Sequence, residues 1–75
     1  MEKKNAKDIF VWAMQNGETK IADRILVKLM PQLVKFGCTL TASDIEAEES
    51  IMVPGELYEL IKITAEELLG MSFNI

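Results

Sequence analysis

The chain has 75 residues, 49% of them hydrophobic, and its twelve acidic and eight basic side chains give a net charge of −4. It has no histidine and a single cysteine, Cys38, so one copy offers neither an internal disulfide nor the ligands of a common Cys/His zinc site. Without an imidazole it also lacks the usual acid–base catalyst near neutral pH. We therefore expect one small domain over residues 1–75 that is not an enzyme, with no catalytic residues, no cofactor and no metal.

The first predicted helix covers residues 5–16. Asn5 is a favourable N-cap residue, and Asp8 places a negative charge in the first turn, where the helix dipole favours it. Apolar residues recur at helical spacing and predict one buried face: Ala6, Ile9, Phe10, Ala13 and Met14. Gly17 predicts the end of this helix, because glycine tolerates the left-handed conformation.

The second predicted helix covers residues 18–37 and contains Pro31. Five apolar residues keep helical spacing across the proline: Ile21, Ile25, Leu29, Leu33 and Phe36. Proline lacks an N–H, and its ring clashes with the carbonyl four residues back, so the helix must bend or restart there. Because the apolar stripe keeps its phase, we expect a kink at Pro31. Two helices joined at residues 30–31 are the alternative.

Residues 40–53 are predicted to form a short irregular or one-turn helical connection. Ser43, with Glu46 three positions later, matches a capping box for a short helix over residues 44–50. The apolar positions here make a poor helical face. Strands at residues 38–40 (CTL) and 51–53 (IMV) are therefore the alternative.

The last predicted helix covers residues 54–69. Pro54 suits the first turn of a helix, and Gly70 predicts its end. A broad apolar stripe lies between them: Leu57, Leu60, Ile61, Thr64, Ala65 and Leu68. The expected fold class is all-α, a small bundle of three main helices with a kink at Pro31.

The end of the chain, ITAEELLGMSFNI, looks like the first helix and turn of a helix-turn-helix DNA-binding motif. Only five residues follow Gly70, however, which is too few for the second helix that reads the major groove. The glutamates of the preceding helix would also repel phosphates. A basic stripe of Lys20, Arg24 and Lys28 could touch nucleic acid, but three cations on a helix usually form a solvated face. We expect no nucleic-acid partner.

Charge divides unevenly along the chain. Residues 1–37 carry seven basic and four acidic side chains, whereas residues 38–75 carry one basic and eight acidic ones. Four of these acids form a run: Asp44, Glu46, Glu48 and Glu49. A calcium-binding EF-hand loop starting at Asp44 would need glycine at its sixth position and glutamate at its twelfth, and the chain has neither. Such a run usually forms a solvated face, and the two halves of the chain can complement each other within one fold or across a dimer. The functional alternative is that the run presents negative charge to a basic protein partner.

Self-association is predicted from the apolar content. A domain of this size buries only about 60% of the surface that its unfolded chain exposes. Extended apolar patches on a protein surface usually mark interfaces. The residues that we expect at such an interface are one aromatic of the first helix and three tail residues: Trp12, Met71, Phe73 and Ile75. A homodimer is the expected assembly.

These features together predict a non-catalytic, protein-binding regulatory protein that occupies a surface on a larger partner. Small acidic inhibitors and regulators from phages and mobile elements are of this type. A DNA-associated transcriptional regulator that uses the basic first half is one alternative, and a structural subunit of a larger assembly is another. No signal peptide and no apolar run of about 20 residues is visible, so we expect a cytoplasmic protein without a membrane partner.

Overall fold

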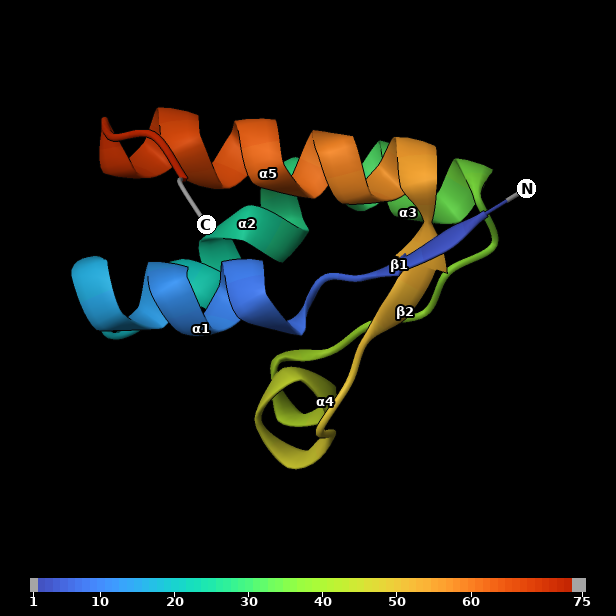
Figure 1. The fold of residues 1–75 in the computed structure, drawn as a ribbon, viewed down its shortest axis with the longest axis horizontal. Coiled ribbons are helices and arrows are strands. Elements are labelled where there is room, and N and C mark those ends of the chain that lie inside the picture. Colours follow the sequence, from blue (N-terminus) through green and yellow to red (C-terminus); the bar gives the residue numbers. More distant parts are fainter. Residues whose placement is uncertain (1, 74–75) are drawn as a thin grey trace.

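The computed structural model describes residues 2–73. Within this range, five helices surround a common core, and one small antiparallel sheet of two strands lies at the edge (Figure 1). The chain order is β1 (Lys3–Asn5), α1 (Lys7–Asn16), α2 (Ile21–Lys28), α3 (Met30–Lys35), α4 (Ala42–Ala47), β2 (Met52–Pro54) and α5 (Gly55–Leu69). The fold is mostly helical, as predicted, but the sheet shows that it is not purely all-α.

The sheet joins the start of the chain to the segment that leads into α5. Lys3 lies opposite Pro54, and Asn5 lies opposite Met52. The strand β2 corresponds to the alternative strand at residues 51–53, shifted by one position, whereas residues 38–40 form no strand. The strand β1 was not predicted, because its Lys-Lys-Asn sequence has no alternation of apolar and polar residues.

Asn5 connects the sheet to α1. Its side-chain Oδ1 accepts hydrogen bonds from the backbone N–H of Lys7 (3.0 Å) and from that of Ile51 (2.9 Å). The helix begins at Lys7, and Ala6, not Asn5, occupies the N-cap position. The predicted N-cap at Asn5 is therefore wrong by one residue. Its side chain still satisfies a first-turn N–H of α1 while also holding the chain just before β2.

Gly17 ends α1, but for a different reason from the one predicted. Its backbone is extended, with φ −111° and ψ −170°, and is not left-handed. A Cβ at this position would lie 2.7 Å from Cδ2 of Leu69 and 2.9 Å from the carbonyl oxygen of Ala13. The Leu69 methyl group lies at the end of a flexible side chain and can move, but the Ala13 carbonyl is backbone of α1. Glycine is therefore required mainly by the backbone at the end of α1, with Leu69 of α5 packed close beside it.

The segment around Pro31 forms two helices, so the predicted kink within a single helix is wrong. Leu29 separates α2 from α3, and Pro31 lies in the first turn of α3. A helix does not use the N–H groups of its first turn, so proline is well tolerated there. The predicted apolar stripe remains buried across the junction, with Ile25 on one side and Leu33 on the other.

The connection between α3 and β2 contains a short helix, α4, as predicted, but it starts earlier. Its capping box pairs Thr41 with Asp44, not Ser43 with Glu46. Thr41 Oγ1 accepts from the Asp44 N–H, and the Asp44 carboxylate accepts from the Thr41 N–H, both at 3.1 Å. Ile45 is fully buried and attaches α4 to the core.

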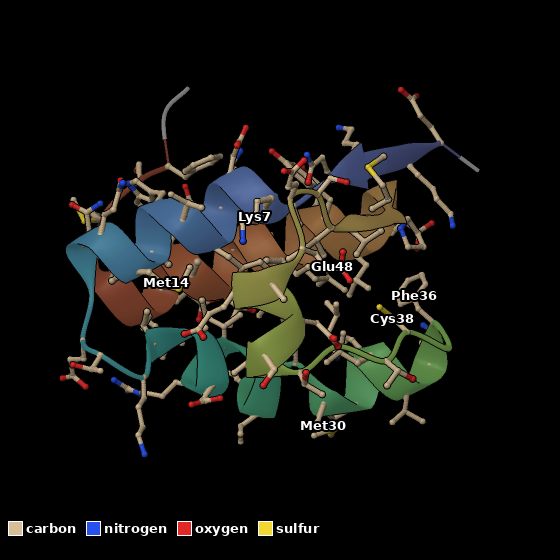
Figure 2. All side chains as sticks on the ribbon, turned by 90° about the horizontal axis from the view of Figure 1, so that it is seen from below. Lys7, Met14, Met30, Phe36, Cys38 and Glu48 are labelled. Carbon is tan, nitrogen blue, oxygen red and sulfur yellow. The ribbon has the colours of Figure 1, made fainter. Side chains whose placement is uncertain are left out.

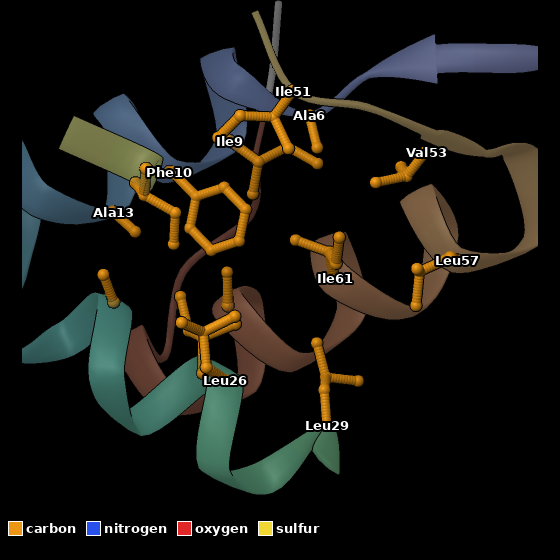
Figure 3. Close-up of a cluster of buried hydrophobic side chains, with 14 of the residues drawn as sticks. Ala6, Ile9, Phe10, Ala13, Leu26, Leu29, Ile51, Val53, Leu57 and Ile61 are labelled. Atoms are coloured by element: carbon orange, nitrogen blue, oxygen red, sulfur yellow. The ribbon is translucent and has the colours of Figure 1, made fainter. Parts of the chain in front are cut away.

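The core lies where α1, α2 and α5 pack against one another. Phe10 of α1 points toward α2 and α5 and lies near Ile61 (Figure 3). Gly70 ends α5 in the left-handed conformation, φ +68°, as predicted. In the described part of the chain, no helix is both long and apolar enough to cross a membrane. The fully buried large side chains are Phe10, Ile9, Ile21, Ile25, Ile45, Leu57, Ile61 and Val53.

Candidate protein-interaction surfaces

A line of apolar side chains is exposed on the outer side of α2 and α3. Val27 is 69% exposed, Met30 53% and Val34 72%. Each lies on the exposed side of its own helix, whereas Ile25 of α2 and Leu33 of α3 are buried. Figure 2 shows Met30 pointing away from the body of the protein. We call these three residues the α2–α3 stripe.

A shallow groove of about 340 Å³ adjoins the stripe at its α2 end. Val27 and, from α5, Leu68 are its apolar lining residues. The charged residues around them are mainly basic: Lys20, Asp23, Arg24 and Lys28. The border of the stripe on this side therefore carries more cations than acids, and two of its cations, Arg24 and Lys28, pair with glutamates outside the groove.

Two ion pairs lie beside the groove. Arg24 contacts Glu18 at 3.3 Å, and Lys28 contacts Glu67 of α5 at 3.7 Å. All four side chains are at least half exposed, so each pair contributes little to stability and can exchange for other partners. The Lys28–Glu67 pair also shows that the outer faces of α2 and α5 are neighbours.

The outer face of α5 is acidic around one apolar residue. Ile63 is 48% exposed. Glu59 lies one turn before it and Glu67 one turn after it, and Glu56 lies one turn further toward the start of the helix, all three exposed. We call Glu56, Glu59, Ile63 and Glu67 the acidic face of α5. This face has the opposite charge to the border of the α2–α3 stripe.

The predicted acidic run at α4 is divided by the structure. The Asp44 carboxylate is used within the chain, as the cap of α4. Glu46, Glu48 and Glu49 are exposed, and no ion pair within residues 2–73 involves them. On the other side of α4, Lys7 donates a hydrogen bond to the carbonyl of Ile45 (Figure 2). Three of the four residues thus remain accessible, and their role in binding a partner stays a prediction.

The predicted self-association residues do not form one exposed patch. Phe73 is only 9% exposed, and its ring packs edge-on against Trp12 with centroids 5.0 Å apart. Its backbone N–H also donates to the Glu66 carboxylate at 2.8 Å. Met71 is exposed, and Ile75 lies outside the described residues. In the described tail, Phe73 is therefore covered by the chain itself, whereas Met71 keeps an exposed apolar side chain.

The α2–α3 stripe was not predicted, although the sequence contains a signal for it. Val27, Met30 and Val34 repeat at helical spacing, as the buried stripe of the same segment does. A segment with two apolar stripes on opposite sides can bury only one of them in a small domain. The second stripe is then a candidate interface.

Two observations on the described residues bear on reactive groups, one on the thiol and one on possible metal ligands. Burial raises the pKa of the Cys38 thiol, and the nearby charge of Lys3 opposes this only in part. The thiol is therefore protonated at neutral pH and is a weak nucleophile. In the part of the chain that the structure describes, no three His, Cys, Asp or Glu side chains are grouped to hold a metal ion.

Comparison with known proteins gives no relative: no family model, no curated protein and no solved structure matches the chain.

Proposed function

We propose that this chain is a non-catalytic, protein-binding regulatory protein that associates with itself and occupies a surface on a larger partner. The observation that carries this proposal is the α2–α3 stripe. Fully burying a Val or Met side chain contributes roughly 1.5–3 kcal/mol. Three such side chains in line on one exposed face therefore favour contact with another protein surface.

A non-catalytic role is supported by the chemistry of the available side chains. The chain has no histidine, and the pKa of its one thiol is raised by burial. The acidic residues of α5 and of the α4 segment are mostly exposed, which leaves them without the desolvation that adapts a carboxylate for acid–base work.

Binding to protein is favoured over binding to nucleic acid by the surroundings of the basic residues. Arg24 and Lys28 are each paired with a glutamate, and Asp23 lies in the same groove. The acidic face of α5 is adjacent. A phosphate backbone needs several neighbouring cations without competing acids, because its affinity comes from the counterions they release.

Self-association is tested by measuring the molar mass with light scattering from low micromolar to near-millimolar concentration. We expect the mass to rise from that of a monomer to that of a dimer. A monomer over the whole range would contradict this half of the proposal.

The partner-binding half needs a separate measurement, which is affinity capture from the host with three baits. The baits are the wild type, Val27→Asp/Val34→Asp and Glu46→Lys/Glu48→Lys/Glu49→Lys. We expect a partner that the wild type retains and that one of the two variants loses. A set of retained proteins that neither variant changes would contradict the assignment of partner binding to these surfaces.

A further inference from the structure

We propose that the α2–α3 stripe of one copy packs against the acidic face of α5 of a second copy, and that a two-fold dimer makes this contact twice. The inference rests on the proposed self-association and specifies its surfaces. The interface predicted at Trp12 and the tail is replaced by two helical faces that lie next to each other on the same molecule.

The apolar parts of the two surfaces are complementary. The stripe presents three exposed aliphatic or thioether side chains, and beside it Val27 and Leu68 line a groove. The acidic face presents Ile63, with polar or charged residues on either side along the helix. Ile63 is the apolar residue that the acidic face offers to this groove, and the glutamates on either side of it would face the charged border.

The charges of the two surfaces are also complementary. Over residues 18–35 the outer side of α2 and α3 carries four exposed cations and two exposed acids: Lys20, Arg24, Lys28, Lys35, Glu18 and Asp23. Within one copy Arg24 pairs with Glu18 and Lys28 pairs with Glu67, so the proposed contact exchanges these exposed pairs for pairs between copies. The acidic face of α5 carries three exposed glutamates. Opposite charges at the border of an apolar contact increase the association rate and fix the orientation of the partners. The uneven charge of the two halves of the chain then has a use across the dimer.

The geometry suits a closed two-fold assembly. The segment from Ile21 to Lys35 and the helix α5 each contain 15 residues, about 22 Å of helix. The Lys28–Glu67 pair shows that both surfaces lie on neighbouring sides of one molecule. A two-fold axis beside the two surfaces would let the α2–α3 stripe of each copy contact the acidic face of α5 of the other copy. A dimer of stripe against stripe would instead bring basic borders together, which is unfavourable.

Charge reversal on each surface tests this arrangement. One variant is Lys20→Glu/Arg24→Glu, and the other is Glu59→Lys/Glu67→Lys. Each variant alone opposes like charges at both contacts, so we expect its self-association to weaken roughly tenfold or more. In a one-to-one mixture, a dimer can form from one copy of each variant. At one of its contacts the reversed stripe meets the reversed α5 face, so opposite charges meet again, and at the other contact both surfaces are wild type. We expect the mixture to recover wild-type dimerisation.

Matched controls carry the same changes of charge away from the two surfaces. They are Lys3→Glu/Lys4→Glu on β1 and Glu46→Lys/Glu48→Lys at α4, and both should dimerise like the wild type. All the altered side chains are exposed, and circular dichroism checks that each variant folds. If a reversed variant unfolds, Lys20→Gln/Arg24→Gln and Glu59→Gln/Glu67→Gln take its place, and each should weaken the dimer.

The possible failures are distinct. A wild-type dimer that neither reversal weakens, or a mixture that stays monomeric, would overturn the assignment of these two surfaces and leave self-association intact. A wild type that is monomeric at near-millimolar concentration would overturn both the dimer and the self-association on which it rests.

Discussion

The C-terminal tail and the outer side of α2 and α3 are both rich in apolar residues, but the fold treats them in opposite ways. The tail folds back so that Phe73 is almost fully buried on Trp12. The α2–α3 stripe has no such cover, and Val34 remains 72% exposed. Hydrophobic sequence alone therefore does not show where a small protein has apolar surface left for a partner. The neighbours that each side chain finds in the fold decide it.

The difference follows from local geometry. Beyond Gly70 the chain is free to turn, and the Phe73 N–H reaches the Glu66 carboxylate one and a half to two helical turns back. The stripe residues are fixed on helices whose other side is already committed to the core. Because a helix cannot turn both sides inward in a domain with one core, the stripe must face outward.

Replacing Phe73 with alanine should give the largest loss of stability. The buried ring and its edge-on contact with Trp12 disappear, and we expect the free energy of unfolding to fall by about 3 kcal/mol. Denaturant titration measures this. Trp12 is the only tryptophan, so its emission should also shift toward that of an exposed indole.

The matched control is Val34→Ala, which removes apolar atoms from the exposed stripe. It should change stability by no more than about 0.5 kcal/mol. Equal losses in Phe73→Ala and Val34→Ala would contradict the contrast between a covered tail and an uncovered stripe.

Much of the helical framework could be predicted from the sequence, because its signals are local. The buried spacing from Ile21 to Leu33 and the glycine end of α5 at Gly70 both hold in the structure. The strand β1 could not be predicted, since Lys3 and Lys4 gain their conformation only by pairing with residues about 50 positions away. The crowding around Gly17 could not be predicted either, because Leu69 comes close to it only in the folded chain.

The candidate surfaces were less predictable than the helices. The acidic run was visible in the sequence, but its division by the cap at Asp44 depends on where α4 starts. The α2–α3 stripe was visible as spacing, yet whether Val27 or Ile25 faces the core depends on how α2 packs on α1 and α5.

A second prediction concerns the packing of the end of α1 against the end of α5, close to the tail. Gly17→Ala places a Cβ against the Leu69 side chain and the Ala13 carbonyl oxygen, so the end of α1 must distort and Leu69 must move. We expect a loss of about 1–3 kcal/mol in denaturant titration. Gly55→Ala is the control, because a Cβ there meets only an ordinary contact of 3.5 Å to the Glu2 carbonyl. If both substitutions were equally mild, the close packing at this end of the molecule would be refuted.

A smaller effect is expected at Pro31, which lies beside the stripe. Since Pro31 occupies the first turn of α3 and is exposed, Pro31→Ala should change the free energy of unfolding by less than about 1 kcal/mol. A thermal melt measures the change. A clear loss of stability or of assembly would mean that the bend at Pro31 shapes the core or an interface, as the kinked-helix interpretation requires.

The contrast between stripe and tail is decided by sedimentation velocity of two variants at concentrations where the wild type is a dimer. Val27→Asp/Val34→Asp places charges in the stripe, and Met71→Asp places one on the exposed part of the tail. The three altered side chains are exposed and contribute little to the core, so both variants should fold. We expect the stripe variant to sediment as a monomer and the Met71 variant as a dimer. A dimeric stripe variant together with a monomeric Met71 variant would show that the tail, and not the α2–α3 stripe, is the interface.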